Sequence, residues 1–171
     1  MRKTTIALAF LVAWFFAAPT GWEQKSDDKE HAELAKALKD AKISLQRGLT
    51  ASAKEGKPIS AKYEVEHGKL QLSVYTMKGD RFSEVIVDHK TGKVAKAEPI
   101  TGGDDLTAAK AQSEAMANAK RSLDAAASDA VKDNKGYRAV SVMPALKDGH
   151  PVADVMLVKG TEWKTVSEKL D

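Results

Sequence analysis

The chain of 171 residues carries 27 lysine and arginine residues against 24 aspartate and glutamate residues, and it has no cysteine. Disulfides and thiolate chemistry are therefore excluded, so stability has to come from packing. Charges of both signs are interspersed along the sequence, which excludes the basic stripe of a nucleic-acid-binding protein.

The first predicted element is a secretory signal peptide over residues 1–21. Arg2 and Lys3 precede the apolar run IALAFLVAWFFAA, and PTGW follows it. This run has 13 residues, whereas a membrane-spanning helix needs about 20. We therefore expect cleavage and a periplasmic or secreted protein of nearly neutral charge, with no stable membrane span. An uncleaved membrane anchor is the alternative.

A long amphipathic helix is predicted next, from about residue 27 to residue 55. Its apolar residues recur at spacings of three and four, which places them on one helix face: Leu34, Leu38, Ala41, Leu45 and Leu49. Asp27 and Glu30 have the spacing of a capping box at its start. Gly56 and Pro58 are expected to end it.

Three or four antiparallel strands are predicted after this helix, because apolar and polar residues alternate with a period of two. The strands lie in ISAKYEV, KLQLSVYTM and FSEVIV and around Val94, separated by the turns HG, KGDR and DHKTG. One helix and this meander would form a complete α+β unit over residues 22–98.

The same pattern then starts again after a predicted linker at residues 99–105, whose helix cap is expected at Asp104 or Asp105. AKISL reappears as AKRSL 78 positions later, and VYTMKGDRFSEV reappears as VMLVKGTEWKTV 81 positions later. The three additional residues are assigned to the segment ALKDGH. The predicted fold class is thus α+β, with two tandem repeats at residues 22–98 and 106–171.

The first repeat resembles the PepSY domains of exported bacterial proteins. The resemblance lies in the helix ending EGKPI, the alternating AKYEVEHGKLQLSVYTM and the ending EVIVDHKTGKV, and it covers residues 32–97. The second copy is degenerate, because TVSEKLD stands where DHKTGKV would be. The resemblance implies an envelope module of one helix against an antiparallel sheet, with inhibitory or regulatory roles towards peptidases and no catalytic residues.

The four histidines, His31, His67, His89 and His150, do not have zinc-site spacing, and neither HExxH nor GxSxG occurs. His67 and His150 both fall in first hairpin turns, where solvated turn polarity is the favoured interpretation and a metal site the alternative. In DHKTG, Asp88 is expected to bond the backbone while Gly92 supplies a positive φ. We therefore predict neither an enzyme nor a cofactor.

Side-chain alternation predicts an apolar patch on the sheet face turned away from the helices. In the first repeat Leu70, Leu72, Val74, Val85 and Val87 face the helix. The opposite face of the second repeat is expected to carry Val140, Val142, Val152, Met156, Val158 and Trp163. The candidate protein-interaction residues are Tyr75, Met77, Phe82, Ile86, Met156 and Trp163. Either the repeats bury this patch against each other or share it across one sheet, or it binds a partner.

The sequence therefore predicts an exported, non-enzymatic PepSY-like binding or regulatory module that acts on an envelope protein, with peptidases as a candidate class. The alternative is a small-ligand or metal-binding periplasmic protein that uses the turn histidines and acids. Neither a metal nor a nucleic acid is expected as a partner in the first case.

Overall fold

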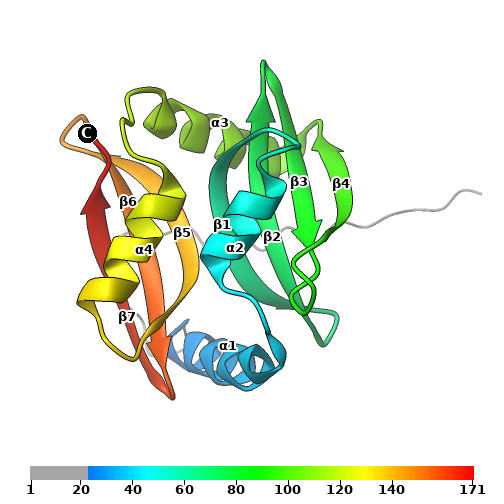
Figure 1. Ribbon diagram of the computed structural model, residues 1–171, viewed down its shortest axis with the longest axis vertical. Coiled ribbons are helices and arrows are strands. Elements are labelled where there is room, and N and C mark those ends of the chain that lie inside the picture. The colour runs from blue at the N-terminus through cyan, green and yellow to red at the C-terminus, as the bar shows by residue number, and fades with distance from the viewer. Residues whose placement is uncertain (1–22) are drawn as a thin grey trace, which may run out of the picture.

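The computed structural model describes residues 23–171 and has an α+β fold, as the sequence predicts (Figure 1). The helices are α1 (Glu23–Ala37), the 3-10 helix η1 (Leu38–Asp40), α2 (Leu45–Ser52), α3 (Gly103–Ala117) and α4 (Leu123–Asp133). The strands are β1 (Lys57–Glu66), β2 (Lys69–Lys78), β3 (Arg81–Val87), β4 (Val94–Ile100), β5 (Arg138–Lys147), β6 (His150–Lys159) and β7 (Glu162–Lys169). The predicted signal peptide, residues 1–21, lies outside the described residues.

The seven strands form one antiparallel sheet in the order β4-β3-β2-β1-β5-β6-β7. At its centre β1 and β5 pair at two positions, where Ala61 lies opposite Val142 and Lys62 lies opposite Ser141. The neighbouring pairs, β1 with β2 and β5 with β6, run along nearly the whole strands. The sheet therefore consists of two meanders joined at a short seam. We call residues 23–100 the first half and residues 103–171 the second half.

The single long helix predicted for the first half is wrong, because the chain breaks between η1 and α2. At the break the amides of Lys42 and Ile43 donate to the carbonyl of His89, at 2.8 and 3.2 Å. Ser44 then adopts an extended backbone and caps α2 by accepting from the amide of Arg47 at 3.2 Å. α1 itself begins upstream of the predicted start at Asp27.

The second half has an equivalent break between α3 and α4. The amides of Lys120 and Arg121 donate to the carbonyl of Leu170, at 2.7 and 3.0 Å. Ser122 caps α4 by accepting from the amide of Ala125 at 3.1 Å. The cap predicted at Asp104 or Asp105 is also wrong, because α3 begins at Gly103 with Gly102 as its N-cap. The predicted linker is shortened, because β4 extends to Ile100.

The three additional residues of the second half lie in a helix and not in ALKDGH. β1, β2 and β3 begin at residues 57, 69 and 81, and β5, β6 and β7 begin at residues 138, 150 and 162. Each strand of the second half thus starts 81 positions after its counterpart. α2 has 8 residues, whereas α4 has 11. The insertion is therefore close to one extra turn of α4, since a helical turn takes about 3.6 residues.

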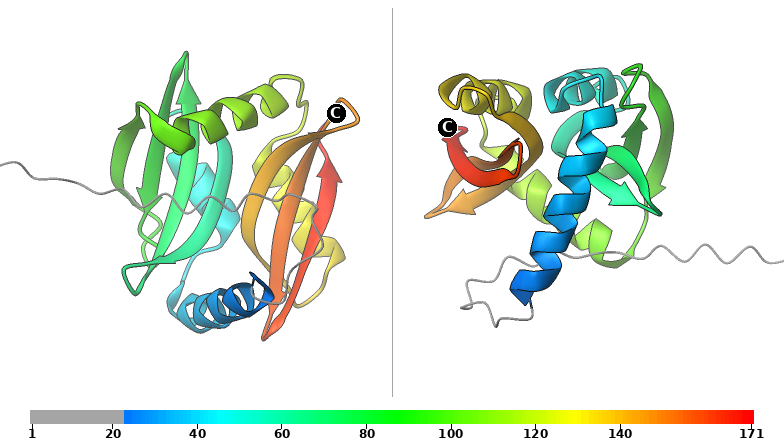
Figure 2. Two further views of the ribbon diagram at one scale, coloured as in Figure 1. Left: turned by 180° about the vertical axis from the view of Figure 1, so that it is seen from behind. Right: turned by 90° about the horizontal axis from the view of Figure 1, so that it is seen from below.

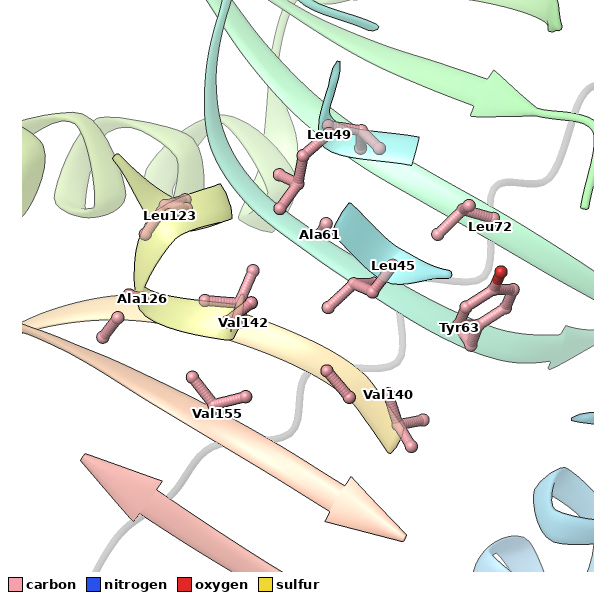
Figure 3. Close-up of a cluster of buried hydrophobic side chains, with 14 of the residues drawn as sticks. Leu45, Leu49, Ala61, Tyr63, Leu72, Leu123, Ala126, Val140, Val142 and Val155 are labelled. Carbon is pink, nitrogen blue, oxygen red and sulfur yellow. The ribbon is translucent and has the colours of Figure 1, made fainter. Parts of the chain in front are cut away.

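This shift corrects the predicted faces of β5. Val142 was expected on the sheet face away from the helices, but it is paired with Ala61 and Val155. Val140 and Val142 are both buried and lie in the core cluster with Leu45 (Figure 3). A β-bulge between Ala139 and Ser141 further breaks the strict alternation. The prediction used a spacing of 78 for this strand, and an odd error of three residues reverses its faces.

One hydrophobic core lies between the sheet and the helices α2 and α4, and it continues across the seam. Figure 3 shows Leu45 and Leu49 of α2 and Leu123 of α4 clustered with the strand residues Ala61, Leu72, Val142 and Val155. Leu45 is 0% exposed and Leu123 is 2% exposed. Both helices use their apolar faces in the same way, so the halves share one core and are not separate domains.

The remaining helices lie elsewhere. α3 crosses the sheet face opposite α2 and α4, and α1 runs along one end of the strands (Figure 2). On α1, the ring of His31 stacks on Trp163 of β7 with 4.3 Å between centroids and 12° between planes. α1 of the first half therefore contacts β7 of the second half, and α3 of the second half contacts β2 of the first half. In the described part of the chain, no helix has the length and apolar character needed to cross a membrane.

Candidate functional site

The candidate site is the face of the first half that turns away from α2 and α4, which we call the distal face. Pairing of β2, β3 and β4 arranges its side chains in three cross-strand rows. The rows are Met77, Phe82 and Ile100; then Tyr75, Glu84 and Glu98; then Ser73, Ile86 and Lys96. The four interaction residues predicted for the first repeat, Tyr75, Met77, Phe82 and Ile86, all lie in these rows.

The first row is covered by α3, so its residues serve internal packing. Ser113 of α3 donates its hydroxyl to Met77 Sδ at 2.8 Å, and Phe82 is only 7% exposed. Beside this row Ser60 donates to Gln112 Oε1 of α3 at 2.7 Å. Of the two explanations for the predicted patch, burial between the halves is thus the one found at Met77 and Phe82.

The second row holds a carboxylate that is poorly solvated. Burial raises the pKa of Glu84 above its usual value, an effect opposed by the nearby Ser73 hydroxyl and reinforced by the negative charge of Glu64. Burial also raises the pKa of Tyr75, and the neighbouring carboxylates of Glu84 and Glu64 raise it further. Tyr75 is therefore a neutral hydrogen-bonding group at physiological pH.

Lys62 lies beside the acids of this row. Lys62 Nζ is 2.6 Å from Glu64 Oε2, and Ser73 Oγ donates to Glu64 Oε1 at 2.8 Å. Lys62 also lies over the Tyr75 ring, 6.0 Å from its centroid. Glu64 is thus well partnered, whereas Glu84 faces Glu98 across the β3–β4 pair. This row combines an aromatic ring with a carboxylate that the fold does not fully neutralise.

The third row leads from the fully buried Ser73 to the open end of the distal face at Ile86 and Lys96. Ile86 is half-buried, and beside it Lys96 Nζ lies 2.7 Å from Glu98 Oε1. Ile86 and Gln71 border a hollow of about 540 Å³ at the end of the strands, which His67 and His89 also line. An apolar side chain at the edge of a hollow, ringed by charged groups, has the composition of a protein contact surface.

The DHKTG turn beside this hollow has the predicted structural role. Asp88 Oδ1 accepts from the amides of Lys90 and Thr91, at 2.9 and 2.7 Å, and from the Thr91 hydroxyl at 3.0 Å. The bonds from Thr91, and then that from Lys90, lower the pKa of Asp88. Gly92 has φ of 73°. His89 Nδ1 is buried and has no hydrogen-bond partner among residues 23–171.

Met156 and Trp163 lie on the second half, and the structure does not bring them to Tyr75 and Ile86. β1, β5 and β6 separate β2 from β7 in the sheet. Met156 and Trp163 are half-buried, and Trp163 is covered on one side by His31. The six predicted residues therefore form two separate groups.

The turn histidines are equally dispersed. His67 occupies the β1–β2 turn, and His150 begins β6 with its Nδ1 2.9 Å from Asp171 Oδ2. Within the described residues, no three side chains of the metal-ligating types histidine, cysteine, aspartate and glutamate come together.

Sequence reasoning missed a clamp at the seam. Arg138 of β5 donates to the carbonyls of Leu38 and Ile43, at 3.0 and 3.3 Å, and its guanidinium lies 5.6 Å from the centroid of Tyr63. Tyr63 donates to the same carbonyl of Ile43 at 2.8 Å. A cleft of about 600 Å³ between α2 and α4 opens beside this clamp. The partners are about 100 residues apart, so no local pattern could reveal them.

Comparison with known proteins gives no relative: no protein-family model, no curated protein and no solved structure matches the chain.

Proposed function

We propose that this chain is an exported, non-enzymatic binding module made of two tandem PepSY-like repeats, which acts on a protein of the bacterial envelope. Peptidases are the candidate target class that the PepSY-like sequence features suggest. The binding site in this proposal is the open part of the distal face, around Ile86, Tyr75 and Glu84.

The backbone supports the repeat part of the proposal. The strands recur at one constant spacing, and both helix breaks are held in the same way, by two amides that donate to a carbonyl near the end of the third strand. His89 accepts from Lys42 and Ile43, while Leu170 accepts from Lys120 and Arg121. A serine caps the following helix in both halves. Such repeated detail is the expected trace of a duplication.

The observation that carries the binding part is the uneven cover of the distal face. α3 fills the row of Met77 and Phe82 but leaves Ile86 at the rim of a hollow. Next to it lies Glu84, whose burial is unfavourable to its charged form. A partner that places a cationic group on Glu84 and an apolar group on Ile86 would stabilise this arrangement.

A capture experiment from envelope extract tests the proposal. The purified chain, its Ile86→Glu variant and its Leu146→Glu variant would each serve as bait, and captured proteins would be identified by mass spectrometry. Leu146 is a matched control, because it is an exposed apolar residue on the second half. We expect a partner that binds the unaltered chain and Leu146→Glu but is lost with Ile86→Glu. Equal capture by all three baits would refute this site.

The alternative of a small-ligand or metal-binding protein would use the turn histidines and acids, but within residues 23–171 no three metal-ligating side chains come together. The two turn histidines lie in different halves, and the acid nearest to either is the Asp171 partner of His150.

A further inference from the structure

The sheet has two edges, β4 and β7, and the backbone groups on these edges can be assigned from the hairpins. Lys159 and Glu162 flank the two-residue turn between β6 and β7. The two residues that flank such a turn exchange backbone hydrogen bonds with each other. The residue after them, here Trp163, therefore points its amide and carbonyl away from β6, out of the sheet edge. The outward-facing residues of β7 are therefore Trp163, Thr165 and Ser167.

The β4 edge is blocked against strand addition. By the same rule, Lys78 and Arg81 exchange backbone hydrogen bonds across the β2–β3 turn, so the backbone groups of Phe82, Glu84 and Ile86 point towards β4. Their partners on β4 are Ile100, Glu98 and Lys96. Pro99, which lies between two of these bonded positions, therefore faces outward. It has no amide hydrogen, and proline at an edge position is a common protection against pairing with another strand.

The β7 edge has no such protection. β7 has the sequence EWKTVSEK, without proline, and Thr165 and Ser167 are exposed. β7 ends the strand order and lies at the rim of the sheet (Figure 1). Towards its end, Arg121 Nη1 donates to the carbonyl of Lys169 at 2.6 Å. Among residues 23–171, the free part of this edge is thus the stretch from Trp163 to Ser167.

We propose that β7 pairs antiparallel with β7 of a second copy of this chain, about a two-fold axis at Val166. In this register Val166 lies opposite Val166, and both symmetry-related Thr165–Ser167 pairs exchange backbone hydrogen bonds. Lys164 of each copy, whose Nζ also donates to Asn134 Oδ1 and lies 4.2 Å from the Tyr137 ring centroid within its own chain, lies opposite Glu168 of the other copy. Opposite charges in directly facing positions stabilise an antiparallel pair.

The charges on β7 favour this register over those centred on the two preceding residues. A two-fold axis at Thr165 would place Glu162 opposite Glu168, and an axis at Lys164 would place two lysines opposite each other, both of which are destabilising. Glu168 has no ion-pair partner among the described residues, so it is free to accept one. Because Pro99 blocks the other edge, the assembly closes as a dimer and does not grow into a fibre.

Analytical ultracentrifugation of the purified chain tests this proposal without any other partner, so its failure is distinct from failure of the proposed function. We expect a concentration-dependent monomer–dimer equilibrium. Thr165→Pro removes an outward amide and should raise the dimer Kd by about tenfold or more. Ala97→Pro, the matched change on the outward side of β4, should leave the Kd unchanged.

A charge exchange provides the second arm and does not depend on proline. Glu168→Lys places like charges opposite each other and should weaken the dimer, while Lys164→Glu combined with Glu168→Lys should restore it. Circular dichroism would verify folding of each variant. A chain that is monomeric at all concentrations would overturn the proposal. A dimer that responds to Ala97→Pro, or to none of the β7 changes, would overturn this interface.

Discussion

Glu84 is a residue whose chemistry departs from what its position alone would predict. A glutamate in the middle of a strand is usually solvated, but here burial makes its charged form unfavourable and raises its pKa. For an acid, a raised folded-state pKa means that the folded state loses stability as the pH rises from the unfolded value, about 4.3, through the folded value. Residues that reduce stability in this way are concentrated at functional sites.

Replacing Glu84 with glutamine should therefore raise the free energy of unfolding at pH 7. The amide keeps the shape of the side chain and one acceptor oxygen, replaces the other oxygen with an N–H₂ donor, and removes the charge. At pH values below the ordinary glutamate pKa the advantage should disappear, because both forms are then neutral. Urea titrations of the two proteins at several pH values measure this. Equal stability at pH 7 would show that the charge is adequately solvated.

The histidines allow a direct test of the metal-binding alternative. A metal that binds only the native state raises the Tm by mass action. Since His67 and His150 lie in different halves and the described residues hold no three-ligand group, we expect zinc, copper and calcium to leave the Tm unchanged. A Tm increase that His150→Ala abolishes would instead establish a metal site at the β5–β6 turn, where His150 contacts Asp171.

At the scale of elements, α2 and α4 hold equivalent positions over the sheet. Leu45→Ala and Leu123→Ala should each lower the free energy of unfolding by about 2–5 kcal/mol, because both leucines are fully buried and leave cavities. Leu146→Ala, at an exposed position, should change it by less than about 0.5 kcal/mol. Denaturant titration compares the three variants. Small effects at either buried leucine would argue against the proposed equivalence of the helices.

α1 is linked to β7 through the stacked rings of His31 and Trp163. Trp163 is half-buried, so Trp163→Ala should cost about 1–3 kcal/mol, less than emptying a core site. A double-mutant cycle with His31→Ala should give a coupling energy of about 0.5–1.5 kcal/mol. Strictly additive effects would mean that the two rings stabilise the protein independently.

The elements also show where sequence patterns are informative. The alternation in β1, β2 and β3 predicted those strands and their turns, because each hairpin is a local feature. The helix breaks were missed because apolar spacing continues across them: Leu38 and Leu45 both reach the core although Ser44 begins a new helix. The hydrogen bonds that hold the break involve His89, far away in the sequence.

For the whole molecule, the sequence predicted the α+β class and offered a shared sheet as one way of joining the halves, but it did not indicate the contacts of the seam. The seam depends on the short pairing of Ala61 with Val142 and on the Arg138 clamp, and neither has a local signature. A spacing error of three residues placed Val142 on the wrong face of β5. At the candidate site, the sequence predicted Tyr75 and Ile86 on the correct face. It could not predict that α3 covers Met77 and Phe82, since that contact joins the two halves.

The central claim is that the open distal face around Ile86 binds an envelope protein. Site-specific photo-crosslinking in living cells tests it most directly, with a photoreactive amino acid at position 86 and, as the control, at position 146. We predict a discrete adduct with an envelope protein from position 86 and none from position 146. No adduct from position 86, or the same adducts from both positions, would contradict the claim.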